Sequence, residues 1–87
     1  MIDIDLLKTR GYIEASTYRT KVMKNLENEY LTPTQISKKS QIRVNHISKT
    51  LWELKQKKLI ECINEEAHKG RLYHLTEKGE KVRKILK

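Results

Sequence analysis

A dense group of basic side chains lies in the middle of this 87-residue chain, between Pro33 and Ile60. With seven basic residues and one acidic residue, Glu53, segment 33–60 has a net charge of +6, out of +8 for the whole sequence. Positive charge concentrated on one segment of a small domain is typical of a surface that binds phosphate groups. The basic residues are Lys38, Lys39, Arg43, Lys49, Lys55, Lys57 and Lys58.

Length and composition limit the class of protein. A chain of 87 residues supports one modest hydrophobic core, so we expect a single domain over residues 1–87, with residues 1–15 as an N-terminal extension of the core 16–87. No apolar run approaches the ~18–20 residues that a membrane span needs, and the N-terminus has no signal-peptide pattern. One cysteine excludes an intramolecular disulfide. We therefore expect a cytoplasmic protein that has no contact with membranes.

Candidate metal ligands and catalytic groups do not occur at recognisable spacings. Cys62, His68 and His74 are six residues apart in each step, which matches no common zinc pattern. No nucleophile, base and orienting group recur together, and there is no glycine-rich phosphate loop. The sequence therefore predicts neither an enzyme nor a protein with a metal or cofactor.

The basic segment contains a strongly amphipathic helix. Val44, Ile47, Leu51 and Leu54 are spaced three, four and three residues apart, so they share one face of a helix that we expect from about Arg43 to Lys57. The opposite face carries Asn45, His46, Lys49, Glu53 and Gln56.

A second, shorter helix precedes the amphipathic one. Thr32 is a suitable N-cap, Pro33 fits the first turn, where its missing N–H costs nothing, and Gln35 occupies the capping-box position. Ile36 anchors this helix to the core, and we expect it to end near Ser40.

The N-terminal region predicts two further helices. Ile2, Ile4 and Leu6 alternate as a strand would, but Ile4, Leu7, Tyr12 and Ile13 also line one side of a helix, and we favour a helix from about Asp5. Ser16 or Thr17 then caps a helix that stops near Asn28. Its apolar face consists of Tyr18, Val22, Met23 and Leu26.

The C-terminal third predicts a β-hairpin followed by a helix. Two β-rich runs, 59–63 and 72–75, flank a polar turn at 64–71 that contains Gly70. Thr76 caps the last helix, in which Val82, Ile85 and Leu86 form an apolar stripe. Gly79 inside that helix costs about 1 kcal/mol relative to Ala unless close packing requires it.

This order of elements, and the residues that carry it, resembles a known family. The match covers residues 16–84 and is similar to the MarR/ArsR-like winged-helix transcriptional regulators, especially the small archaeal ones. The motifs are Ser16-x-x-Arg19-x-x-Val22-x-x-x-Leu26, Thr32-Pro33-x-x-Ile36, Val44-x-x-Ile47-Ser48-x-x-Leu51-x-x-Leu54, Leu59-Ile60 and Gly70-Arg71-x-Tyr73-x-Leu75-Thr76-x-x-Gly79.

The resemblance implies a fold and a function. The fold would be mainly α with a small β-hairpin wing, a winged helix-turn-helix, and the function sequence-specific binding of double-stranded DNA in transcription regulation. One departure concerns Lys58, because the family usually has Gly before the Leu-Ile pair to end the recognition helix. We therefore expect a non-glycine residue in a left-handed conformation at this turn.

The resemblance also assigns roles to individual residues. The helix from Arg43 to Lys57 would lie in the major groove and the hairpin on the flanking backbone or in the minor groove. Arg71 has a competing role, a salt bridge to Glu65 or Glu66. The expected base readers are Asn45, His46 and Lys49. The expected phosphate contacts are Thr34, Gln35, Lys38, Lys39, Arg43 and Thr50, and the expected wing contacts are His68, Lys69 and Arg71.

Aromatic residues raise the question of partners. Trp52 turns away from the apolar stripe, and we favour packing within the monomer, beneath the wing or against the N-terminal segment, over a role in a dimer interface. We expect a homodimer, and its candidate contact surface consists of Tyr12, Tyr18 and Tyr30. The alternative function is a winged-helix interaction module that binds another protein of the transcription, replication or RNA machinery. Such a module would expose an apolar patch on the recognition helix in place of its polar residues.

Overall fold

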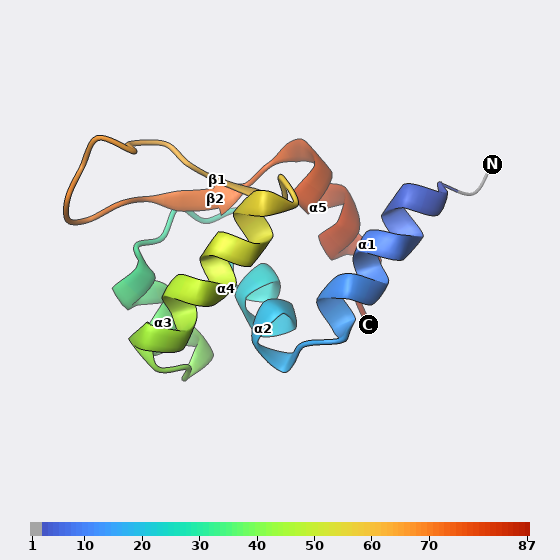
Figure 1. Cartoon of the computed structure of the whole chain (residues 1–87), viewed down its shortest axis with the longest axis horizontal. Coiled ribbons are helices and arrows are strands. Elements are labelled where there is room, and N and C mark those ends of the chain that lie inside the picture. The colour runs from blue at the N-terminus through green and yellow to red at the C-terminus, as the bar shows by residue number, and fades with distance from the viewer. Residues whose placement is uncertain (1–2) are drawn as a thin grey trace.

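The computed structural model describes residues 3–87, in which five helices pack together and a two-stranded antiparallel hairpin lies at their edge (Figure 1). This mainly helical architecture confirms the predicted fold class. Ile2, on which the strand alternative for the N-terminus partly relied, lies outside the described residues. The elements are α1 (Ile4–Glu14), α2 (Thr17–Asn25), α3 (Pro33–Ser40), α4 (Val44–Gln56), β1 (Ile60–Cys62), β2 (Tyr73–Leu75) and α5 (Glu77–Lys84).

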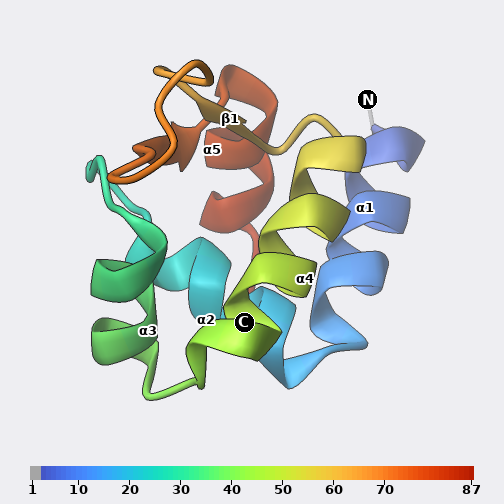
Figure 2. The same ribbon diagram turned by 60° about the vertical axis from the view of Figure 1, so that its left-hand side comes forward.

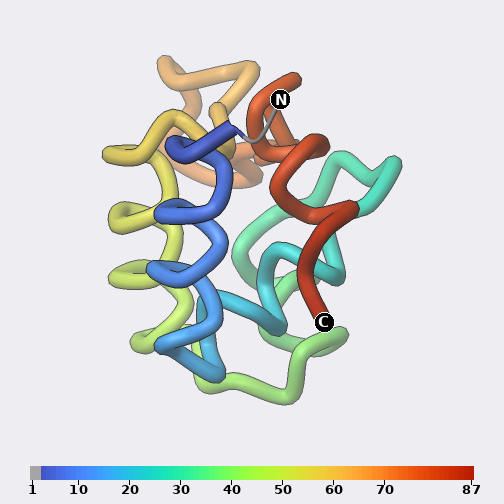
Figure 3. The backbone as a smooth tube through the Cα atoms, turned by 90° about the vertical axis from the view of Figure 1, so that its right-hand side faces the viewer, coloured from blue at the N-terminus to red at the C-terminus, as the bar shows by residue number. Residues whose placement is uncertain are grey.

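The N-terminal segment is a helix, as favoured, and begins one residue earlier than expected. The Asp3 carboxylate accepts a hydrogen bond from the Leu6 amide and so caps α1. α1 packs beside α2 and α5 (Figure 3). Ile13 is fully buried, but Ile4 and Leu7 are 64% and 46% exposed, so the expected apolar side of this helix is only partly used within the molecule.

The predicted capping box at the start of α3 is present. The Thr32 hydroxyl accepts from the Gln35 amide at 3.2 Å, and the Gln35 side chain accepts from the Thr32 amide at 2.9 Å. α3 ends at Ser40, as expected, and Gln41 continues with a φ of 59°. A short turn then leads into α4, and Figure 2 shows the two helices on either side of it.

The amphipathic helix α4 buries Ile47, Leu51 and Leu54. The expectation that Val44 belongs to this buried face is wrong, because its side chain is 48% exposed. Val44 is the first residue of α4, where the chain has only just entered the helix, and Ile42 of the preceding turn fills the core instead, with 4% exposure.

The hydrophobic core lies where α2, α3 and α4 contact one another. Two predicted members are largely outside it: Tyr18 is 41% exposed at the start of α2, and Ile85 is 37% exposed at the C-cap of α5. Both stand at helix ends, where a periodic pattern no longer guarantees burial. The buried apolar residues are Ile13, Val22, Met23, Leu26, Leu31, Ile36, Ile42, Ile47, Leu51, Leu54, Leu59, Ile60, Leu75 and Val82.

The hairpin forms in the predicted place with shorter strands. Ile60 pairs with Leu75 and Cys62 with Tyr73. On the other side of β2, Leu31 exchanges two backbone hydrogen bonds with Tyr73, of 2.9 and 3.0 Å. The hairpin is thereby tied to the segment that enters α3, and its tip extends beyond α3 in Figure 1.

A tight corner joins α4, the hairpin and α5. Lys58 has a φ of 60°, which confirms the expected left-handed residue after the recognition helix. The Thr76 hydroxyl donates to the Lys58 carbonyl at 2.7 Å, and the Thr76 amide donates to the Leu59 carbonyl at 3.0 Å. A Cβ atom added to Gly79 would lie 2.0 Å from the Leu59 carbonyl oxygen. Close packing therefore explains the glycine inside α5.

Gly79→Ala should destabilise the protein severely. The added methyl group would meet the backbone of Leu59, so α5 or β1 must shift, and overpacking of this kind costs about 1–3 kcal/mol or more. The free energy of unfolding, measured by urea denaturation, should fall accordingly. Gly11→Ala in α1 is the matched control, because no atom lies within 4 Å of its added Cβ, and it should stabilise by about 0.5–1 kcal/mol. Equal effects at the two positions would contradict this account.

Candidate nucleic-acid interface

The outward face of α4 presents a continuous exposed stripe. Asn45, Lys49, Trp52 and Gln56 recur at intervals of four, three and four residues, and all four are exposed. They therefore project on the side of the helix opposite Ile47 and Leu54. Two of the three expected base readers, Asn45 and Lys49, lie side by side near the start of this stripe.

His46, the third expected base reader, lies at the edge of α4 that faces α2. Its ring is 5.2 Å from that of Tyr18, centroid to centroid. Further along the same edge, Glu53 accepts a hydrogen bond from Arg19 at 3.5 Å. His46 remains exposed, but it is separated around the helix from the stripe that carries Asn45 and Lys49.

Thr50 does not fit its expected role as a phosphate contact. It is only 3% exposed, and its hydroxyl donates to the His46 carbonyl at 2.9 Å. The expectation was wrong because Thr50 follows Ile47 by three residues and precedes Leu54 by four, which places it on the buried face of α4.

The start of α4 is open to an anion. Arg43 is its exposed N-cap residue, and within residues 3–87 no side chain caps this helix end. The amide groups of a helix's first turn have no partners inside the helix, and the helix dipole makes this end positive. Uncapped amides next to an exposed guanidinium form a setting that favours phosphate.

α3 carries four further expected phosphate contacts, and all are exposed: Thr34, Gln35, Lys38 and Lys39. The Gln35 side-chain oxygen is already engaged in the capping box, so only its amide hydrogens remain for a ligand. The Lys39 ammonium is 3.1 Å from the Glu29 carboxylate, in a pair in which both side chains are 45% exposed. Lys38 forms no ion pair within the described part of the chain.

Asn64 forms two hydrogen bonds across the loop between β1 and β2. The Asn64 side-chain oxygen accepts from the Leu72 amide at 2.8 Å, and its NH₂ group donates to the Gly70 carbonyl at 3.2 Å. Gly70 has a φ of 69°, which explains the glycine at this position. The exposed basic residues His68 and Lys69 are displayed just before it.

The salt bridge considered for Arg71 is formed by another residue. The Arg71 guanidinium donates to the Ala67 carbonyl at 2.8 Å, and no ion pair with Glu65 or Glu66 occurs within residues 3–87. Glu65 instead forms an ion pair with Lys55 of α4. Their hydrogen bond raises the pKa of the Lys55 ammonium and lowers the pKa of the Glu65 carboxyl. Lys55 thus links α4 to the wing, while Arg71 braces the loop through its backbone.

Two shallow concavities connect the separate groups. The first, of about 370 Å³, lies between the start of α3 and the wing, and it brings Thr34 together with His68, Lys69 and Arg71. The second, of about 220 Å³, lies between α4 and the wing and has Trp52, Lys55 and Arg71 among its lining residues. Arg71 belongs to both, so the expected wing contacts, the start of α3 and the stripe on α4 form one face.

Trp52 is the residue on this face whose place sequence reasoning missed. It lies beside the wing, as one alternative had it, but it is 63% exposed, so the favoured interpretation, packing within the monomer, is wrong. The signal was available in the sequence, because Trp52 follows Asn45 by seven residues and Lys49 by three and so falls on their stripe.

The three tyrosines of the expected dimer surface contact different parts of the molecule. Tyr12 lies under the Arg19 guanidinium, 4.0 Å from the ring centroid, and Tyr30 stacks on His74 at 4.7 Å. Tyr18 packs near His46, as described above. These separate contacts give no sign of a common aromatic surface.

Membrane spans and metal sites are two further features of the described residues that bear on function. Within residues 3–87, no helix combines the length and apolar character of a membrane span. The same residues contain no group of three or more His, Cys, Asp and Glu side chains that is arranged to hold a metal ion.

Comparisons with known proteins agree with this architecture. The sequence model of the winged helix-turn-helix family matches residues 18–87. A MarR family transcription regulator superposes with a TM-score of 0.74 at 22% identity, over 93% of this chain and 55% of that chain. A point mutant of MepR from S. aureus superposes with a TM-score of 0.71 at 22% identity, over 90% of this chain and 62% of that chain. The reduced form of MarR from E. coli superposes with a TM-score of 0.71 at 17% identity, over 97% of this chain and 73% of that chain.

The extent of these matches defines what they show. The chain spans little more than half the length of the first of these structures, and identities below 25% establish the fold alone. No curated protein sequence matches the chain. The family model, in contrast, covers most of the sequence, from α2 to the last residue. The chain therefore belongs to the winged helix-turn-helix family, with the fold seen in MarR-family regulators.

Proposed function

We propose that the protein is a transcriptional regulator that binds double-stranded DNA in a sequence-specific manner. The observation that carries this proposal is the single basic face on which the stripe of α4, the start of α3 and the wing meet. α4 would enter the major groove, and the wing would lie on the flanking backbone or in the minor groove. Bound at a promoter, the protein would control access to it.

Base recognition is assigned to the start of α4. Asn45 offers the bidentate amide that suits adenine, and Lys49, one turn later, is a donor to guanine O6 and N7. His46 stands at the edge facing α2, so it would reach a base beside those contacted by the other two. Recognition helices of this class contact base edges through their N-terminal residues, which is where these side chains stand.

Phosphate recognition is assigned to two groups that flank the stripe. Arg43 and the uncapped amides of α4 form one group, together with Thr34, Gln35, Lys38 and Lys39 of α3. His68, Lys69 and Arg71 of the wing form the other. Such contacts position a protein on the duplex and supply affinity without reading its sequence. Thr50 has no part in the proposal, because it is buried.

We further propose a homodimer, which would present two recognition helices to a palindromic site about 34 Å apart. Support comes from α1, on which Ile4 and Leu7 lie one helical turn apart with exposures of 64% and 46%. Pairing of α1 with its counterpart in a second copy would cover them. This surface replaces the tyrosines as the candidate contact.

One observation favours a second function, a module that binds another protein. The expected mark of such a module was an exposed apolar patch in place of the polar residues of α4. Those polar residues are exposed, but Trp52 beside them is apolar and 63% exposed. Its neighbours Lys55 and Arg71 are basic, however, and exposed aromatic rings among cations also suit nucleic acids. DNA binding remains the better-supported proposal, and Trp52 offers a direct test between the two.

Duplex binding should depend steeply on salt. After selection of a preferred site from randomised duplexes, fluorescence anisotropy would give the dissociation constant at several salt concentrations for that site and for a scrambled one. Each neutralised phosphate contributes about 0.9 to the slope of log affinity against log salt, so we expect a slope of about −3 or steeper. Absence of binding at low salt would refute the proposed function.

Substitutions should separate base contacts from phosphate contacts. Asn45→Ala or Lys49→Ala should reduce the discrimination between the preferred and the scrambled site by about 1–3 kcal/mol, because a base contact is lost. Lys38→Ala should weaken both equally and reduce the slope by about 0.9. Lys84→Ala removes the same charge from α5, outside the proposed face, and serves as the control. If all four variants behaved alike, the division of roles would be wrong.

Trp52 emission should report duplex binding directly. It is the only tryptophan of the chain, so its fluorescence can be assigned without mutation. We expect the preferred duplex to quench or shift the emission, and Trp52→Ala to lower duplex affinity, because the exposed indole lies on the same stripe as Asn45 and Lys49. Unchanged emission together with unchanged affinity of the variant would exclude Trp52 from the DNA contact.

Leu7→Glu should convert the dimer to a monomer, because it places a charge in the proposed α1 contact. Sedimentation velocity at micromolar concentration would measure the mass of each form. Lys21→Glu, at an exposed position of α2, is the control for a glutamate at the surface and should leave the dimer intact. A wild-type chain that sediments as a monomer would contradict the proposed dimer without affecting the test of DNA binding by a single copy.

A further inference from the structure

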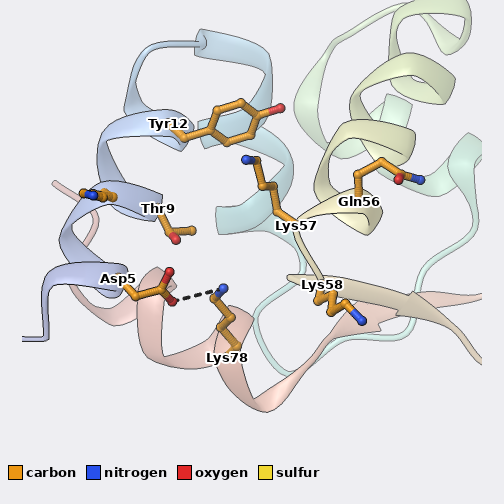
Figure 4. A pocket seen from close by; sticks show the side chains of 8 residues that line it. Asp5, Thr9, Tyr12, Gln56, Lys57, Lys58 and Lys78 are labelled. Carbon is orange, nitrogen blue, oxygen red and sulfur yellow. Dashed lines mark ion pairs between the residues drawn. The ribbon is translucent and has the colours of Figure 1, made fainter.

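A larger cavity lies away from the proposed DNA-binding face. It has a volume of about 420 Å³ and is bounded by α1, by the C-terminal end of α4 and by the start of α5 (Figure 4). α1 stands at the end of the molecule opposite the wing tip (Figure 1). None of the residues assigned above to base or phosphate contacts lines this cavity.

The walls of the cavity are strongly basic. Among the described residues, Asp5 is the only acidic one that lines the cavity. The four lysines that line it are Lys8, Lys57, Lys58 and Lys78. In Figure 4 the Lys57 side chain extends into the cavity, where its ammonium lies 4.9 Å from the centroid of the Tyr12 ring. Lys58 stands at the rim and points outward. The cavity thus combines an excess of positive charge with one aromatic wall.

One lysine in the cavity already binds an anionic group. The Lys78 ammonium is 3.1 Å from the Asp5 carboxylate, which belongs to the first turn of α1. Asp5 is 70% exposed in this pair and Lys78 is 38% exposed, and pairs this accessible to water contribute little stability. A small anion with more charge than a carboxylate would therefore compete effectively with Asp5 for Lys78.

The hydroxyl of Thr9 supplies an independent indication. Thr9 is only 8% exposed, lines the cavity and is directed into it in Figure 4. Thr20 and Thr50 on other helices donate their hydroxyls to the carbonyl four residues earlier, at 3.0 and 2.9 Å. Within residues 3–87 the Thr9 hydroxyl forms no such bond. In the described part of the chain the only enclosed side-chain polar atom without a partner is Arg83 Nε, so the Thr9 hydroxyl is open to the cavity and can donate to a ligand there.

We propose that this cavity binds a small phosphate-bearing molecule. The phosphate would accept a hydrogen bond from the Thr9 hydroxyl and charge-assisted hydrogen bonds from Lys57 and Lys78, and would displace the Asp5 carboxylate. Lysine ammonium groups serve as point-charge donors to phosphate. None of the residues that line the cavity is assigned to a base or phosphate contact, so the site is separate from the proposed DNA contacts. Gln56 alone belongs both to the cavity and to the end of the stripe on α4.

Pyrophosphate is the probe for this site, and calorimetric titration of the full chain at low ionic strength would measure its affinity. Lys57→Ala and Thr9→Val should each weaken binding about tenfold, the effect of removing one hydrogen bond to a charged group. Asp5→Asn should strengthen binding about threefold, because the competing carboxylate is gone. Lys57 and Asp5 are exposed, so their variants test the site even if Thr9→Val proves unstable.

Two controls change the net charge elsewhere by the same amount. Lys84→Ala removes one positive charge, and Glu66→Gln in the wing loop removes one negative charge. Both should leave pyrophosphate affinity unchanged. If they altered it as much as the cavity variants do, the attraction would be one of overall charge, and the proposed site would be refuted.

The location of the probe can be checked directly. In two-dimensional amide NMR spectra, pyrophosphate should shift the signals of Thr9, Lys58 and Lys78. Shifts that gather instead at Thr34, Lys38 and Lys69 would place the anion on the DNA-binding face and overturn the proposal. Absence of any binding at millimolar pyrophosphate would overturn it as well, whatever the result of the DNA experiments.

Discussion

The contact between α5 and the corner after α4 is the constraint on which the rest of the structure depends. Lys58 follows the C-cap of α4 in a left-handed conformation, and the hairpin starts two residues later. Thr76 and Gly79 pack onto the Lys58 and Leu59 carbonyls. Since an added Cβ at Gly79 would meet the Leu59 backbone, α5 can approach so closely only because this residue lacks one. The same corner fixes the angle between α4 and the wing, and hence the shape of the candidate interface.

Features set by neighbouring residues in the sequence could be predicted, and features set by distant ones could not. The caps at Thr32 and Thr76 and the turn at Lys58 are local, and all were predicted. Burial at helix ends depends on what packs there, so Val44 was misplaced. Thr50 was misassigned although its spacing indicates the buried face. The site roles of Asn45, His46 and Lys49 remain predictions, because a fold alone does not test them.

The two proposed sites divide the positive charge of the chain in a way that a charge count does not reveal. Lys38, Arg43 and Lys49 belong to the face shared with the wing, whereas Lys57 and Lys58 stand at the opposite end of α4 beside α1. Lys55 is assigned to neither site, because it forms an ion pair with Glu65. One basic segment would therefore serve two proposed sites near opposite ends of α4, and through Lys55 it also holds the wing in place.

The paired hydrogen bonds between Leu31 and Tyr73 join the wing to the entrance of α3. Without them, the hairpin would keep only its own base and the exposed Lys55–Glu65 pair as anchors, and it would sample more orientations relative to the helices. With them, the groups expected to straddle a nucleic acid keep a fixed spacing before any partner arrives. Less conformational entropy is then lost on association, so a larger share of each contact's free energy appears as affinity. Such preorganisation would raise the affinity that a given area of contact with DNA provides.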